Sequence, residues 1–266
     1  MIFLKNILIT GAGSGLGKMA AIRLAKRGHH VYATTHYENE ANTLNEYAKK
    51  NNINLESFKL DILLEEDRLK TLKYDIDVLI NNAAIGDSGS ISEINVDRIE
   101  NVFETNVFSN IKLTQLVLKN MIKKGNGRVI FLSSLAGKIS IPFLAPYASS
   151  KFAIEGFVEA LRMELKLLKN SQIDIILIEP GAYATGFNKE NNDKKYTWMY
   201  EESYFKNRLP HLQEKETKIW NFIESKNFNS IVSKYIKAVE SKHPKFRYTA
   251  PFSQSVLTQI GRIFGM

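Results

Sequence analysis

The chain has 266 residues, of which 44% are hydrophobic and 24% charged. These proportions are typical of a globular protein and exclude a disordered, collagen-like or coiled-coil chain. Because cysteine is absent, disulfides, thiol catalysis and cysteine-ligated metals are excluded, which fits a reducing compartment. No stretch reaches the roughly 18 apolar residues of a membrane helix, and the first nine residues are too short for a signal peptide. We therefore expect a cytoplasmic protein.

The net charge of +8 is concentrated in the last part of the chain. Residues 187–266 contain 14 basic and 8 acidic side chains, so they contribute +6 of that total. The basic runs are short and have no zinc-finger, aromatic RNA-binding or helix-turn-helix pattern beside them. We interpret this excess as a solvated basic face, with an anionic partner as the alternative, and predict no nucleic-acid partner.

Short apolar runs alternate with segments of helical period along the first 180 residues. The predicted strands are residues 7–9, 31–35, 55–60, 76–80, 128–132 and 173–178, and long helices are expected at 102–123 and 146–169. Apolar strands that alternate with helices predict an α/β fold, a doubly wound parallel sheet with helices on both faces. No linker composition divides the chain, so we expect a single domain over residues 1–266.

The pattern changes after Gly181. Residues 182–216 combine many aromatic and charged side chains without a sustained period, and they follow a strand on the side where open α/β sheets bind ligands. We interpret this segment as a substrate lid with apolar character. Residues 217–241 have helical spacing, residues 246–250 are a possible last strand, and residues 256–266 are mildly amphipathic. For that last segment, docking on the chain's own domain is favoured over a membrane or a subunit contact.

A glycine-rich turn connects the first strand to the first helix. Gly11, Gly15 and Gly17 lie where a backbone can approach a pyrophosphate closely, and the free N–H groups of the following helix favour negative charge. The motif predicts a nucleotide site but does not identify a reaction.

Tyr147 and Lys151 are four residues apart in a predicted helix that begins near Pro146. This spacing places both side chains on one helix face, about 6 Å apart along the axis. A phenol with a pKa near 10 needs roughly 4 kcal/mol of preferential stabilisation to ionise near neutral pH. We expect the lysine and the positive end of the helix to lower the pKa of Tyr147, which makes it a candidate proton donor and acceptor.

Further polar residues lie at the ends of two predicted strands that precede Tyr147. Ser133 and Ser134 end the strand before the tyrosine, and residues 81–84 (Asn-Asn-Ala-Ala) end the strand before that. The motifs of the chain are Thr10-Gly-x-x-x-Gly-x-Gly17, Asp61, Asn-Asn-Ala, Asn106, Ser134, Tyr147-x-x-x-Lys151 and Pro180-Gly-x-x-x-Thr185. In the order and spacing of these motifs, the chain resembles the short-chain dehydrogenases/reductases. The resemblance covers residues 5–185 and implies a Rossmann-like fold. Ala84 departs from the usual glycine of the family, which narrows the space there.

The resemblance implies hydride transfer between a nicotinamide and a carbonyl or secondary alcohol. Tyr147 would exchange the proton of the substrate oxygen, and Ser134 would bind that oxygen. Lys151 would lower the pKa of Tyr147 and hold the nicotinamide ribose, while Asn106 would position a water that relays protons to Lys151. Ser133 is disfavoured, because neighbouring strand residues point to opposite faces.

The same resemblance implies a set of cofactor-binding residues: Gly11, Ser14, Gly15, Leu16, Gly17, Thr35, His36, Asp61, Ile62, Asn82, Ala83, Ala84, Tyr147, Lys151, Pro180, Gly181 and Thr185. An acidic residue at the end of the second strand would bind a ribose 2′-hydroxyl and repel a 2′-phosphate. Thr34 and Thr35 are neutral, and His36 stands where an arginine is common in phosphate-binding relatives. NADP(H) is therefore favoured over NAD(H).

We predict an NAD(P)(H)-dependent oxidoreductase acting on an apolar small molecule. Two alternatives remain open: a catalytically silent nucleotide-binding regulatory protein and a dinucleotide-assisted dehydratase or epimerase. No metal site is expected, because the five histidines lack a helical His, Asp or Glu partner. The resemblance implies a homodimer or homotetramer through the helices at 102–123 and 146–169, where Ala148, Ala153 and Gly156 would permit close packing.

Overall fold

A seven-stranded sheet forms the centre of the computed structural model, which describes residues 3–169 and 171–264. The strands are β1 (Asn6–Ile9), β2 (His30–Thr35), β3 (Leu55–Lys59), β4 (Val78–Asn81), β5 (Asn126–Leu132), β6 (Gln172–Pro180) and β7 (Arg247–Ala250). Every neighbouring pair is parallel, in the order β3-β2-β1-β4-β5-β6-β7. The predicted doubly wound parallel sheet is therefore confirmed.

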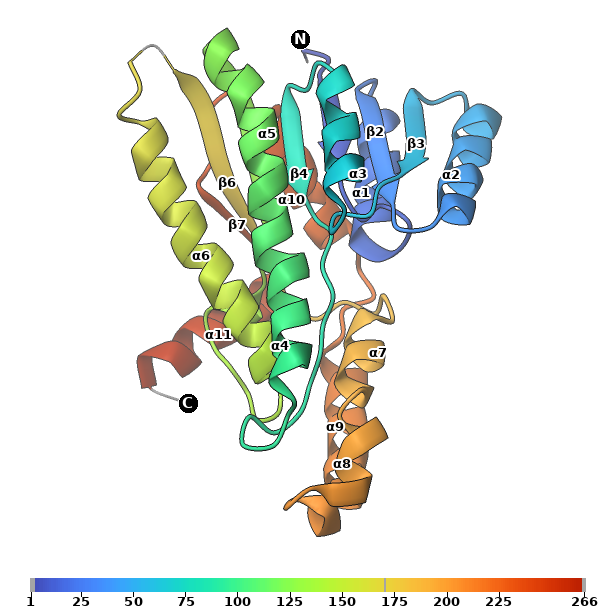
Figure 1. The fold of residues 1–266 in the computed structure, drawn as a ribbon, viewed down its shortest axis with the longest axis vertical. Helices are drawn as coiled ribbons and strands as arrows, with labels where there is room; N and C mark the ends of the chain where they lie inside the picture. Colours follow the sequence, from blue (N-terminus) through green and yellow to red (C-terminus); the bar gives the residue numbers. More distant parts are fainter. Residues whose placement is uncertain (1–2, 170, 265–266) are drawn as a thin grey trace.

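The helices alternate with these strands along the chain (Figure 1). They are α1 (Gly15–Ala25), α2 (Glu38–Asn51), α3 (Glu65–Leu69), α4 (Val96–Phe103), α5 (Ser109–Lys124), α6 (Ala145–Leu165), α7 (Phe187–Asp193), α8 (Tyr196–Glu202), α9 (Leu209–Ile223), α10 (Asn229–Glu240) and α11 (Phe252–Phe264). Among the helices of residues 3–169 and 171–264, none has the combination of length and hydropathy required to span a bilayer.

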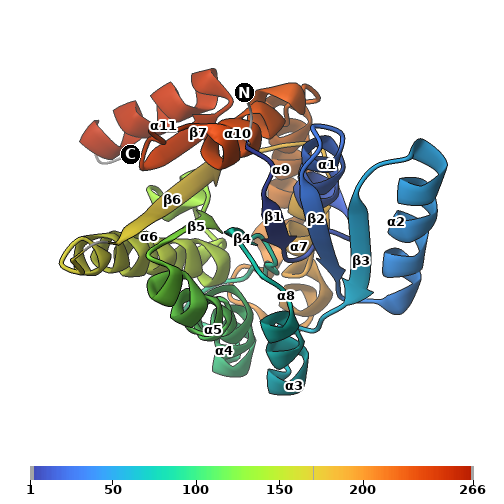
Figure 2. The same cartoon turned by 90° about the horizontal axis from the view of Figure 1, so that it is seen from above.

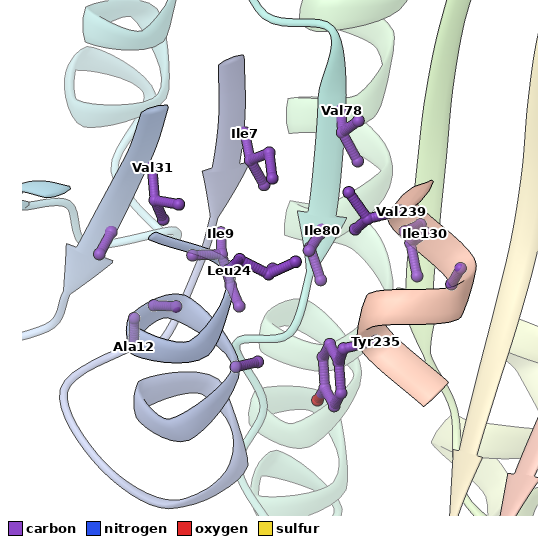
Figure 3. Close-up of a cluster of buried hydrophobic side chains, with 14 of the residues drawn as sticks. Ile7, Ile9, Ala12, Leu24, Val31, Val78, Ile80, Ile130, Tyr235 and Val239 are labelled. Atoms are coloured by element: carbon purple, nitrogen blue, oxygen red, sulfur yellow. The ribbon is translucent and has the colours of Figure 1, made fainter. Parts of the chain in front are cut away.

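Successive strand residues supply two separate cores, because side chains alternate between the faces of a strand. Ile7 and Ile9 join a cluster with α1, α2 and α10, whereas Leu8 joins a cluster with α5 and α6 on the other face. Figure 2 shows the sheet between these two helical layers. In Figure 3, Leu24 of α1 and Tyr235 and Val239 of α10 pack on the first of these faces.

The order of the strands reverses between β1 and β4, which makes this point the topological switch of the sheet. Open α/β sheets bind ligands outside the carboxyl ends of the strands at such a point. Helices α7, α8 and α9 extend beyond these carboxyl ends (Figure 1). The fold therefore brings the glycine turn, the ends of β4, β5 and β6, and residues 182–223 to the same edge.

The predicted lid segment is more regular than its sequence indicates. Residues 182–216 contain α7 and α8, and α9 runs across the expected boundary at 216. Residues 217–241 form the end of α9 and all of α10, with a break at residues 224–228. Helices of seven residues are too short to show a clear hydrophobic period, which is why the sequence pattern missed α7 and α8.

Helix α11 presents its apolar side chains outward. Its buried and half-buried positions are Gln254, Ser255, Thr258 and Gly261, whereas Leu257 and Ile263 are 67% and 76% exposed. The expected docking of this segment on its own chain thus occurs through its polar and small side chains. The predicted segment extends to residues 265–266, which lie outside the described residues.

Candidate active site

A cavity of about 770 Å³ lies along the carboxyl edge of the sheet. Its walls come from the glycine turn, the ends of β4, β5 and β6, the first turns of α6, and helices α7, α9 and α11. A volume of this size is typical of sites for small molecules and cofactors. The strand ends therefore converge on one site, as the sequence predicted.

The glycine turn requires glycine at two points for a steric reason. Gly11 has φ +64°, and a Cβ atom there would lie 2.8 Å from the Ala83 Cα. A Cβ atom on Gly17 would lie 2.5 Å from the Gly11 carbonyl oxygen. The turn leads directly into α1, whose first N–H groups have no partner within the helix. Backbone donors and a positive helix end thus face the cavity, which suits a pyrophosphate.

Asn82, at the end of β4, holds this turn in place. Its Nδ2 atom donates to the carbonyl oxygens of Thr10 and Gly11, at 2.8 and 3.0 Å. The Thr10 hydroxyl in turn accepts from the backbone N–H groups of Asn82 and Ala83, at 3.1 and 3.0 Å. The first residues after β1 and after β4 are therefore locked together across the switch point.

Tyr147 lies in the first turns of α6, where it is half-buried and its phenol lies beside Ser134. Burial raises the pKa of Tyr147 to about 12, and a hydrogen bond with the Ser134 hydroxyl acts in the opposite direction. The Ser134 Oγ accepts from the Ala136 N–H at 3.1 Å and donates to the Pro180 carbonyl at 3.4 Å. Ser134 therefore links the tyrosine to the ends of both β5 and β6.

The predicted lowering of the Tyr147 pKa is wrong for the site as described. Lys151 is on the same face of α6, but its Nζ lies 5.5 Å from the centre of the Tyr147 ring and donates to the Leu132 carbonyl at 2.8 Å. Burial lowers the pKa of Lys151 to about 8, against an opposing effect of Glu155. Burial acts on both groups in the direction of the neutral form, and the helical spacing alone did not reveal it.

Asn106 is buried in a π-helical turn, Glu104–Phe108, between α4 and α5. Such turns often occur at functional sites. Its Oδ1 accepts from the Ile85 N–H at 2.8 Å, and its Nδ2 donates to the Ile85 carbonyl at 2.9 Å and to the Ser150 Oγ at 3.0 Å. Asn106 thus connects the chain after β4 to α6, behind the wall of the cavity.

The opposite end of the cavity, after β2, contains three titratable side chains. The His36 imidazole is 57% exposed, and its Nδ1 lies 3.9 Å from Asp61 Oδ2. The carboxylate of Glu40, on α2, lies against Gly13 of the glycine turn. A Cβ atom added to Gly13 would be only 2.3 Å from Glu40 Oε2. Both carboxylates and His36 line the cavity. Thr35 is fully buried, and its hydroxyl donates to the Tyr37 carbonyl at 2.8 Å.

The structure brings most of the predicted site residues to this one cavity. The predicted residues along its wall are Gly11, Ser14, Gly15, Leu16, Gly17, His36, Asp61, Ile62, Asn82, Ala83, Ala84, Ser134, Tyr147, Lys151, Pro180, Gly181 and Thr185. Thr35 and Asn106 do not line it. Within residues 3–169 and 171–264, no group of three or more His, Asp or Glu side chains is arranged to hold a metal ion.

Only part of the apolar wall comes from the segment in which the sequence placed it. Of the aromatic residues at 182–205, Tyr183 and Phe187 line the cavity, whereas Tyr196 and Trp198 belong to a separate core with Met199 and Leu209. Further apolar wall comes from Ile139, Ile141, Leu144, Trp220, Ile223 and Leu257. The sequence pattern did not indicate these six residues. The first three lie in the loop before α6 and the other three on α9 and α11, and only the fold brings these segments together.

Comparisons with known proteins identify the family of this chain. The family described as short chain dehydrogenase matches residues 5–196. An uncharacterized oxidoreductase of Bacillus subtilis, YusZ, is 38% identical over 189 residues, which cover 68% of this chain and 66% of that protein. The match thus spans slightly less than two thirds of YusZ.

Two further similarities cover more of the chain. The 3-ketodihydrosphingosine reductase of Bacteroides thetaiotaomicron is 32% identical over 244 residues, 91% of this chain and 86% of that protein. The crystal structure of a short-chain dehydrogenase from Streptomyces avermitilis has the same fold, with a TM-score of 0.78 at 22% identity, over 99% of this chain and 94% of that one. The chain therefore belongs to the short-chain dehydrogenase family of NAD(P)-dependent oxidoreductases.

Proposed function

We propose that this protein transfers a hydride between a nicotinamide cofactor and the carbonyl or secondary alcohol carbon of an apolar small molecule, with Tyr147 as general acid and base. The observation that carries the proposal is the convergence of Ser134, Tyr147 and Lys151 on the cavity that also contains the glycine turn. A relative named for the reduction of a ketone, 3-ketodihydrosphingosine, supports the same class of substrate.

The cavity suits a dinucleotide, because its volume of about 770 Å³ extends from the glycine turn to Ser134 and Tyr147. Gly11, Gly15 and the first N–H groups of α1 would hold the pyrophosphate, while Asp61 and Ile62 would adjoin the adenine. When bound, the nicotinamide supplies the hydride donor or acceptor. Thr185 lies next to Gly15: a Cβ atom added to Gly15 would be 3.6 Å from the Thr185 Cβ. Thr185 would therefore cover the glycine turn on this side of the site.

Three side chains, Ser134, Tyr147 and Lys151, would hold the reactants and transfer the proton. The Ser134 hydroxyl and the Tyr147 phenol bind the substrate oxygen, and Tyr147 donates its proton as the carbonyl is reduced. A pKa of about 12 keeps Tyr147 protonated at neutral pH, so the phenol has a proton to donate to the carbonyl oxygen. Lys151, with a pKa of about 8, carries an ammonium at neutral pH and would hold ribose hydroxyls. The proposed water relay at Asn106 stays a prediction.

We further propose NADP(H) as the preferred cofactor. The end of β2 offers Thr34 and Thr35 and no carboxylate, and His36 borders the cavity at this point. Glu40 and Asp61 line the same end, so the preference is expected to be modest, because carboxylates repel a 2′-phosphate.

A homodimer or homotetramer through α5 and α6 is supported by their outer faces. Phe152, Phe157 and Met163 of α6 are 42%, 50% and 57% exposed, and Gly156 has open space beside it. Exposed apolar surface of this kind marks protein interfaces. Ala148 is buried within the chain, so it does not contribute to such an interface. A cytoplasmic location and a single domain with a lid at 182–216 also stay predictions.

The test is turnover of ketones and alcohols followed by absorbance at 340 nm, with NADPH or NADP. We expect Tyr147→Phe to lower the rate by 10²–10⁴, since it removes the proton donor, and to leave NADPH binding intact. Undiminished turnover in Tyr147→Phe would reject the assignment. Turnover without net oxidation or reduction would favour the dehydratase or epimerase, and cofactor binding without any turnover would favour the regulatory protein.

A further inference from the structure

The end of the cavity that faces β5, β6 and β7 has an apolar wall made of three separate segments. Ile139, Ile141 and Leu144 precede α6, Trp220 and Ile223 end α9, and Leu257 lies on α11. Leu144 is only three residues before Tyr147. The apolar wall therefore begins within one helical turn of the proton donor, whereas the glycine turn follows β1, which β4 separates from β5.

Gln254 fixes α11 to both of its neighbours at this wall. Its Oε1 accepts from the Ala182 N–H at 2.7 Å, directly after β6, and its Nε2 donates to the Ile223 carbonyl at 2.6 Å. Figure 1 shows α11 beginning near the upper end of α9, at the carboxyl edge of the sheet. The first turn of α11 is therefore hydrogen-bonded to the last turn of α9.

Leu257, one turn further along α11, belongs both to the cavity and to the outer surface. It lines the cavity, yet it is 67% exposed. Ile141, in the segment before α6, likewise lines the cavity and is 48% exposed. The apolar wall thus continues through the mouth of the cavity onto the surface, where these side chains would lose exposure to water if an apolar chain covered them.

We infer that the substrate carries a long unbranched apolar chain, which runs from Tyr147 along Trp220 and Ile223 and leaves the cavity past Leu257, between α9 and α11. This inference rests on the proposed function, because it places the reacting carbon at Ser134 and Tyr147. A short or polar substrate has no use for an apolar wall that extends beyond the cavity into solvent.

The inference is tested with a series of 2-alkanones from butanone to tetradecan-2-one. The specificity constant kcat/KM should rise by up to about fourfold per added methylene, the value for complete burial of the group, and then level off once the chain has passed Leu257. The rise should come through KM. A flat series, with butanone reduced as well as dodecan-2-one, would overturn the inference and leave the proposed function standing.

Two variants of α11 provide a matched comparison. Leu257→Ser should reduce the ratio of kcat/KM for dodecan-2-one to that for butanone by about five- to tenfold. Ile263→Ser, on the same helix and 76% exposed but outside the cavity wall, should leave this ratio unchanged. Equal effects of the two substitutions would overturn the inference.

A binding measurement separates the tail subsite from the chemistry. The chain has two tryptophans, and Trp220 lines the cavity whereas Trp198 does not. A secondary alcohol with bromine in the middle of its chain, such as 6-bromododecan-2-ol, should quench the wild-type fluorescence and have little effect on Trp220→Phe. Quenching without turnover of any ketone would support the subsite and reject the proposed reaction. Equal quenching of both proteins would reject the subsite.

Discussion

The Tyr235 hydroxyl donates to the Asn82 Oδ1 at 2.9 Å, across 153 positions of the chain. Tyr235 is fully buried in α10 (Figure 3), and Asn82 uses its Nδ2 to hold the carbonyls of Thr10 and Gly11. The nucleotide turn is therefore supported from the core by a helix that approaches from the far end of the sequence.

Tyr235→Phe should weaken cofactor binding several-fold and lower the free energy of unfolding by about 1–2 kcal/mol, since it leaves Asn82 Oδ1 without this buried donor. Calorimetric titration with NADPH and urea unfolding provide the measurements. Tyr248→Phe is the matched control, because the Tyr248 hydroxyl accepts from the Lys245 N–H and does not contact the turn. If both variants weaken NADPH binding equally, Tyr235 does not act through Asn82.

Lys151→Met should abolish turnover and yet stabilise the protein at pH 7. The pKa of Lys151 in the fold, about 8, is below its ordinary value of 10.5, so the unfolded chain binds more protons between these two values. The free energy of unfolding of the wild-type protein should therefore increase as the pH rises from 8 to 10.5, because the cost of burying the Lys151 ammonium disappears over this range. Removal of the buried amine should add about 3 kcal/mol at pH 7 and almost nothing at pH 10.5, measured by urea unfolding.

The contrasting variant is Lys195→Met. Lys195 is equally buried but pairs with Glu216 at 2.7 Å, so its loss removes the opposite charge from a carboxylate to which Asn192 and Tyr196 also donate. We expect Lys195→Met to destabilise the protein by about 3 kcal/mol. Destabilisation by Lys151→Met at pH 7 would show that the bond to the Leu132 carbonyl outweighs the cost of burying the amine.

Glu40→Gln should increase the preference for NADPH over NADH by roughly three- to tenfold at low salt, because it removes a negative charge beside Gly13. His36→Ala should change the preference in the opposite direction. Glu38→Gln is the control, since Glu38 lies on the same helix turn but does not line the cavity. Affinities for 2′,5′-ADP and 5′-ADP give this preference without turnover. An unchanged ratio in Glu40→Gln would show that this carboxylate does not reach the 2′-position.

Asn191→Ala should raise KM for ketones about tenfold and leave NADPH affinity unchanged. Asn191 Oδ1 accepts from the Gly86 N–H at 3.0 Å, and Lys194 Nζ donates to the Gly86 carbonyl at 2.9 Å, so α7 is fastened to the chain after β4. Lys189→Ala, exposed on the same helix, should have no effect. A parallel loss of NADPH affinity in Asn191→Ala would mean that the whole site, rather than the lid contact alone, has been disturbed.

The features that the sequence determined are those that depend on neighbours along the chain. The alternation of strands and helices, the glycine turn before α1 and the shared helix face of Tyr147 and Lys151 all follow from local period and steric limits. They were enough to predict the sheet and to place most of the site residues on one edge, because the carboxyl ends of parallel strands meet there.

The tertiary structure decided what depends on burial and on contacts between distant segments. Enclosure of the Tyr147 phenol raises its pKa, although its helical neighbour Lys151 suggested a lower one. Glu40 faces Gly13 only because α2 packs beside the turn. The amphipathic pattern of α11 identified two faces, but only the docking of Gln254 decided that the apolar face points outward. A side chain's surroundings come from the whole fold, so no window of sequence contains them.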